Sequence, residues 1–153
     1  MLSKFPFQAK RIGITLILLS IPFAYLYFWG GRPEAFNIKV FAIVSQYLET
    51  RYFVLAQTNV LDELAATLLI LGVALFSFSK EKKEEAHFDA LRIKALVNAL
   101  FFSITFWMLS FLFIYGMAIV IISISIFLLF LFVYNLLFRI YLYKYKTIKV
   151  PNR

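Results

Sequence analysis

Two adjacent acidic residues, Asp62 and Glu63, occupy the position in this sequence that best suits binding chemistry. They open an apolar run that extends to Phe78, and a carboxylate at the edge of such a run is costly unless it binds a cation or a partner. Arg32 and Arg51 lie earlier in the chain and could pair with these acids. The four residues together form a candidate ion or partner site.

A structural role explains the same two acids without a ligand. Asn59 can cap the helix that follows, and Asp62 falls at the third position of a capping-box arrangement. Both carboxylates also favour the positive end of the helix dipole. We favour this structural role and keep the binding site as the alternative.

The residue types needed for most catalytic chemistry are missing from the sequence. It contains no cysteine, and its one histidine, His87, lies in a charged stretch rich in lysine. Thiolate nucleophiles and cysteine-based metal sites are therefore excluded, and no glycine-rich phosphate loop or zinc-protease motif occurs. We expect no catalytic residue, no metal and no cofactor, and we predict that the protein is not an enzyme.

The composition indicates that lipid is the solvent for most of the chain. Of the 153 residues, 63% are hydrophobic and 16% are charged, whereas a soluble domain is about 45–50% apolar and about 25% charged. The net charge of +8 comes from basic residues beside apolar runs, which favours contact with anionic lipid headgroups over nucleic acid.

Four apolar stretches predict membrane-crossing helices, at residues 12–29, 61–79, 95–115 and 117–138. Residues 36–57 carry apolar side chains at helical spacing and predict an amphipathic helix in the interface plane. Residues 80–94 are charged and contain neither Gly nor Pro, which predicts a helical hairpin that projects into the cytoplasm. The expected fold is an all-α four-helix transmembrane bundle with an additional amphipathic helix, forming one membrane domain over residues 1–153.

Lysine and arginine are distributed unevenly between the two sides of this bundle. Three lie before the first span, five in the central loop and five after the last span, against three in the loop after the first span. The positive-inside rule therefore places both termini in the cytoplasm. Lys144, Lys146 and Lys149 belong to the basic C-terminal segment and are expected to contact lipid headgroups.

Small residues repeat every seven positions along the second span, at Ala65, Gly72 and Ser79. Such a seam lets helices approach closely in lipid. We favour packing within one protomer, and contact between protomers is the alternative. In the last two spans, Asn98 and Asn135 could meet through an interhelical hydrogen bond.

The second span also resembles a known group of proteins. Its segments Asp62-Glu-Leu-Ala-Ala66, Leu69-Ile-Leu-Gly72 and Phe78-Ser-Lys-Glu-Lys82 are similar to a motif of small bacterial integral-membrane proteins, in which D-E-[IL]-A-A leads through an apolar helix into S-K-E-K. The likeness covers about twenty residues well and the final two-span hairpin in outline. It implies a bacterial cytoplasmic membrane and no particular activity.

Two classes of function fit these patterns. The first is a non-enzymatic accessory or scaffold protein that binds another membrane protein or itself. The second is a small oligomeric channel or carrier whose acidic outer mouth contains Asp62 and Glu63. The scarcity of polar residues in the spans favours the first class.

Overall fold

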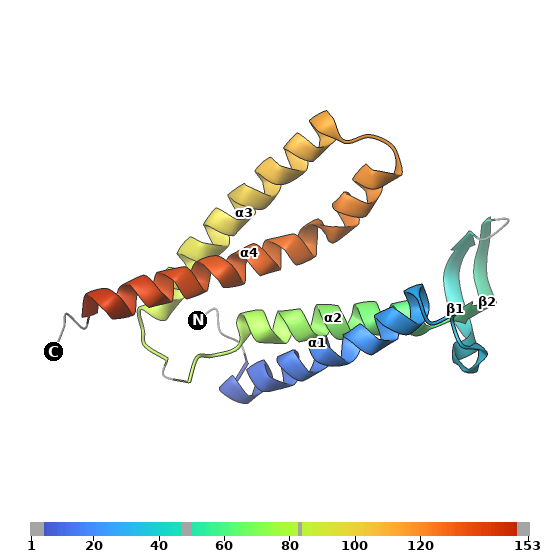
Figure 1. The fold of residues 1–153 in the computed structure, drawn as a ribbon, viewed down its shortest axis with the longest axis horizontal. Coiled ribbons are helices and arrows are strands. Elements are labelled where there is room, and N and C mark those ends of the chain that lie inside the picture. The colour runs from blue at the N-terminus through green and yellow to red at the C-terminus, as the bar shows by residue number, and fades with distance from the viewer. Residues whose placement is uncertain (1–4, 47–49, 83, 150–153) are drawn as a thin grey trace. The chain divides into compact units, whose positions relative to one another are not determined.

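The computed structural model describes residues 5–46, 50–82 and 84–149, and within these ranges it leaves out the side chains of residues 45, 46, 51, 148 and 149. The described elements follow one another in the order α1 (Phe7–Phe28), η1 (Glu34–Phe36), β1 (Asn37–Gln46), β2 (Thr50–Asn59), α2 (Leu61–Phe78), α3 (Phe88–Phe113) and α4 (Met117–Lys149) (Figure 1). The chain forms two compact units, residues 15–72 and residues 1–14 together with 73–153.

Within the described residues, four helices are long and apolar enough to cross a membrane. The four predicted spans fall on α1, α2, α3 and α4. Three of these helices extend well beyond the predicted spans: α1 begins at Phe7, α3 begins at Phe88, and α4 continues to Lys149. All three extensions contain basic residues, whose long apolar stems can pack along a helix while the charged head stays in water.

The predicted amphipathic helix at residues 36–57 is wrong, and the fold is therefore not purely helical. This segment forms the antiparallel hairpin β1–β2, whose register runs from Asn37 opposite Asn59 to Gln46 opposite Thr50. The two strands are rich in Ile, Val, Phe, Tyr and Thr, the residues that favour extended backbone. Their apolar residues fit a period of two as well as the helical period, and the β propensity decides between them.

The end of α1 depends on two glycines. Gly31 has φ of +75°, a conformation in which a side chain is strained, and a Cβ on Gly30 would lie 2.7 Å from the Cα of Leu26. The N–H of Arg32 donates to the carbonyl of Leu26 at 3.2 Å, which closes the helix end. The end of α1 at Phe28 therefore has a clear structural cause.

In the other unit, α3 and α4 form an antiparallel helical hairpin that turns at Gly116, where φ is +73° (Figure 1). Its core lies toward the start of α3 and the end of α4. The buried members of this core are Phe88, Ala95, Ala99, Tyr134, Phe138 and Leu142. Alanines on α3 opposite rings on α4 allow close approach of the two helices.

Two polar contacts join α3 to α4 along the hairpin. The amide of Asn98 donates to the hydroxyl of Tyr141 at 2.6 Å, and the indole N–H of Trp107 donates to Ser123 Oγ at 3.1 Å. Asn135 instead donates to Ser77 Oγ at 2.7 Å, so the predicted pairing of Asn98 with Asn135 is wrong. Interhelical hydrogen bonding does occur, but each asparagine has a different partner.

The predicted helical hairpin at residues 80–94 is wrong in its first half. Helix α2 ends at Phe78 and α3 begins at Phe88, and the described residues between them are not helical. Their backbone groups find other partners: the N–H of Lys80 donates to the carbonyl of Phe5 at 2.9 Å, and the N–H of Glu81 donates to Glu84 Oε2 at 2.8 Å. These bonds replace the helical ladder and fix the loop.

Candidate functional site

A polar pocket of about 280 Å³ lies in the unit of residues 15–72, and we refer to it as the Asp62 pocket. Its lining comes from the end of α1, the turn that follows, the end of β2 and the start of α2. The lining residues are Tyr27, Arg32, Gln57, Thr58, Asn59 and Asp62. Segments far apart in sequence thus bring one carboxylate and one guanidinium to the same concave surface.

Asn59 holds these segments together. Its amide nitrogen donates to the carbonyl of Pro33 at 3.1 Å and to Asn37 Oδ1 at 2.8 Å, while its own Oδ1 accepts the N–H of Leu61 at 3.3 Å. The last bond satisfies one of the free donors at the start of α2. Asn59 therefore contributes to the helix start as expected and also ties it to the turn after α1.

The two charges of the Asp62 pocket are not paired with each other. Among the described residues, neither Arg32 nor Asp62 forms a salt bridge, and Asp62 Oδ1 is buried without a hydrogen-bond partner. The Arg32 guanidinium lies 4.2 Å from the centre of the Tyr27 ring, and its Nε donates to the Tyr27 carbonyl at 3.4 Å. Its terminal nitrogens remain available at an exposed position.

The predicted site of four residues is only partly assembled. Asp62 and Arg32 share the pocket, whereas Glu63 is exposed and does not line it. Arg51 lies in β2 opposite Ser45, and its side chain is outside the described part of the structure. The observed cap of α2 is made by Asn59, and among the hydrogen bonds of the described residues none joins Asp62 to the Asn59 N–H to complete the predicted capping box.

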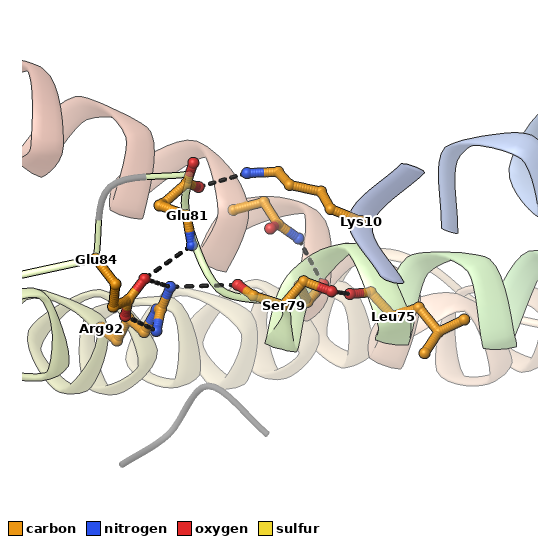
Figure 2. Close-up of polar contacts among 8 residues, drawn as sticks. Lys10, Leu75, Ser79, Glu81, Glu84 and Arg92 are labelled. Carbon is orange, nitrogen blue, oxygen red and sulfur yellow. Dashed lines mark hydrogen bonds and ion pairs between the residues drawn. The ribbon is translucent and has the colours of Figure 1, made fainter. Parts of the chain in front are cut away.

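A second polar site lies in the unit that contains α3 and α4, and we name it the Arg92 cluster: Lys10, Ser79, Glu81, Glu84 and Arg92 (Figure 2). The Arg92 side chain is only 1% exposed. Its Nη1 donates to Glu84 Oε1 at 2.6 Å, and its Nη2 donates to Glu84 Oε2 at 3.3 Å and to the Ser79 carbonyl at 3.2 Å. The guanidinium also lies 4.9 Å from the centre of the Phe138 ring.

The same cluster attaches the start of the chain to the loop after α2. Lys10 of α1 forms a hydrogen-bonded ion pair with Glu81, and Glu81 in turn donates its N–H to Glu84 (Figure 2). Phe5 adds a parallel bridge to Ser79, with its N–H donating to the Phe78 carbonyl at 3.3 Å. Two cations and two carboxylates thus compensate one another, as burial of charge requires.

The geometry of the Arg92 cluster indicates a structural role. Both terminal nitrogens of the guanidinium are engaged by protein acceptors, and the side chain has almost no contact with solvent. In the sequence, Arg92 counts only among the basic residues that set the orientation. Its identity is the available signal: it is the one arginine in a run of lysines, and arginine suits buried bidentate pairing with a carboxylate.

The remaining predicted residues take varied positions. Ala65, Gly72 and Ser79 are buried, and Ser79 Oγ donates to the Leu75 carbonyl (Figure 2). Lys144 and Lys146 are exposed on the last part of α4, and the side chain of Lys149 lies outside the described part. In the part of the chain that the structure describes, no group of three or more His, Cys, Asp or Glu residues could hold a metal ion.

Comparison with known proteins does not assign the chain to a family. No protein-family model, curated protein or solved structure matches the chain.

Proposed function

We propose that the chain is a non-enzymatic accessory or scaffold protein of the bacterial cytoplasmic membrane, which binds another membrane protein or a second copy of itself. The observation that carries this proposal is an apolar groove of about 340 Å³ between α3 and α4. We call it the α3–α4 groove, and its lining residues are Leu100, Ser103, Ile104, Trp107, Ile126, Phe127 and Phe130.

An apolar groove of this kind suits a helix of a membrane partner. In lipid, helices associate by close packing of complementary surfaces and not by escape from water. The surface that lines the groove is apolar, and residues 95–138 of the sequence carry no charge. A partner helix could therefore bury its side chains there without leaving a charge unpaired.

A channel or carrier remains the second candidate, because the Asp62 pocket places a carboxylate and a guanidinium at the ends of α1 and α2. A conducting path needs polar groups along its length, as in the selectivity filters and charged rings of known pores. The α3–α4 groove offers only apolar surface. This difference favours the scaffold.

Photocrosslinking from the groove tests the proposal. A photoreactive phenylalanine analogue at Ile104, which lines the groove, is compared with the same analogue at Phe101, which is exposed on the same helix but does not line it. We expect a discrete protein adduct from position 104 and none from position 101. Adducts to lipid alone from both positions would contradict the scaffold, and ion flux in liposomes that Asp62→Asn abolishes would support the channel.

The proposed orientation has both termini in the cytoplasm, supported by the distribution of Lys and Arg. The segment with Lys144, Lys146 and Lys149 then faces the anionic inner leaflet. The hairpin β1–β2 lies on the opposite side of the membrane, together with the Asp62 pocket.

A further inference from the structure

We propose that the Asp62 pocket binds the headgroup of an ethanolamine phospholipid, with Asp62 accepting hydrogen bonds from the ammonium group and Arg32 donating to the phosphate. This inference rests on the proposed membrane residence of α1 and α2 but not on the scaffold role. It starts from the Asp62 carboxylate and the Arg32 guanidinium, which line the same pocket but form no salt bridge with each other among the described residues.

The first argument concerns Asp62. One of its carboxylate oxygens is buried and has no hydrogen-bond partner in the described part of the chain. A carboxylate that lacks donors at a half-buried position is expensive, so the pocket, which Asp62 lines, favours a ligand that carries N–H or O–H groups. A primary ammonium offers three donors and a positive charge, whereas the trimethylammonium of a choline lipid offers no donor.

The second argument concerns Arg32. Its guanidinium is held against the Tyr27 ring at 4.2 Å and its backbone has φ of +52°, so turn and ring together set its position. Its Nε is used by the Tyr27 carbonyl, which leaves the terminal nitrogens for a ligand. Guanidinium forks match phosphate oxygens well, and such charge-assisted bonds are about twice as strong as neutral ones.

The third argument is location. The pocket lies where α1 ends and α2 begins, at the boundary of two candidate spans. At the end of α1, the rings of Tyr25 and Trp29 stack with their centres 6.2 Å apart. Tyrosine and tryptophan concentrate at the level of lipid headgroups. A volume of about 280 Å³ is at the small end of ligand pockets, which suits a headgroup better than a large molecule.

Trp29 provides a local probe for the test. It is 75% exposed and lies three residues before Arg32, and in a Trp107→Phe background it is the sole tryptophan of the full chain. The protein is reconstituted in phosphatidylcholine bilayers with a low fraction of one lipid whose acyl chains carry bromine. Quenching of Trp29 then reports enrichment of brominated phosphatidylethanolamine, phosphatidylglycerol or phosphatidylcholine around the pocket.

We expect brominated phosphatidylethanolamine to be enriched about tenfold over the other two lipids, which corresponds to 1.4 kcal/mol. Asp62→Asn and Arg32→Gln should each remove this preference. Glu34→Gln is the control, because it removes an exposed carboxylate of the same unit that does not line the pocket, and it should retain the preference. Arg32 is exposed, so its variant reports on binding even if Asp62→Asn fails to fold.

The other outcomes distinguish failure of the headgroup site from failure of the proposed membrane position. Equal quenching by all three brominated lipids would show that Trp29 meets the bilayer but would overturn the headgroup site. Absence of quenching by any of them would overturn the proposed membrane position of α1 itself. Binding of soluble phosphoethanolamine as tightly as the lipid would overturn the assignment to a membrane lipid.

Discussion

Replacing Arg92 with Met should destabilise the protein more than any other single loss of charge among its described residues. Loss of one partner of a buried ion pair costs about 3–5 kcal/mol, because the other charge stays buried without compensation. Here Glu84 is 19% exposed and keeps the N–H of Glu81 as a donor, so the lower end applies. We expect a loss of about 3 kcal/mol in the free energy of unfolding.

The contribution of the pair itself can be isolated by a double-mutant cycle. Glu84→Gln removes the negative charge and preserves the shape of the side chain, and the double variant with Arg92→Met removes both charges of the Arg92–Glu84 pair. Contacting residues in one network typically couple by 0.5–3 kcal/mol. We expect about 2 kcal/mol of coupling, measured from unfolding titrations with sodium dodecyl sulfate in mild detergent.

Lys94→Met is the control for this experiment. Lys94 carries the same charge two residues further along α3, but it is exposed, and its Nζ lies 5.4 Å from the centre of the Tyr141 ring. Loss of such an exposed cation–π contact costs up to about 1 kcal/mol. Equal effects of the Arg92 and Lys94 variants, or full additivity in the cycle, would refute the structural role of the Arg92 cluster.

Three further predictions use the same stability assay or a reporter. Gly31→Ala should cost about 1 kcal/mol because φ is +75° there, and Gly31→Asn should cost less, since Asn tolerates this conformation; the reverse order would contradict the turn geometry. Asn98→Leu and Tyr141→Phe should each cost about 0.6 kcal/mol, and the double variant should cost less than the sum of the two; strict additivity would mean that their hydrogen bond contributes nothing. A reporter fused after Arg153 should be active in the cytoplasm, and activity only outside the cell would overturn the proposed orientation.

The four helices could be predicted from sequence because the signal is local. Each apolar stretch is long enough for a span, and glycines at positions 30, 31 and 116 mark where two of the helices end. The hairpin β1–β2 differs from the predicted helix for a local reason as well: the apolar residues between 36 and 57 satisfy both a helical and a strand period, and the enrichment in β-branched and aromatic residues favours the strands.

The candidate sites depend on contacts between residues far apart in the chain. Asp62 could be identified because a carboxylate at a span boundary is unusual, but its partnership with Arg32 depends on the turn after α1 and on the bonds of Asn59. The Arg92 cluster depends on Phe5 and Lys10, which lie about seventy positions away from their partners. No periodicity or spacing in the sequence encodes that proximity.

Helix α4 has 33 residues, which at 1.5 Å per residue gives a rod of about 50 Å. Its uncharged part, residues 117–138, spans about 33 Å, close to the thickness of a hydrocarbon layer. In the proposed membrane position, the last turns would extend among the headgroups while still packed on α3, with Tyr145 edge-on against Phe88 at 6.3 Å. Since tyrosine and lysine combine an apolar body with a polar tip, a helix in that position would adapt to a thicker or thinner bilayer by a shift along the membrane normal, without unwinding.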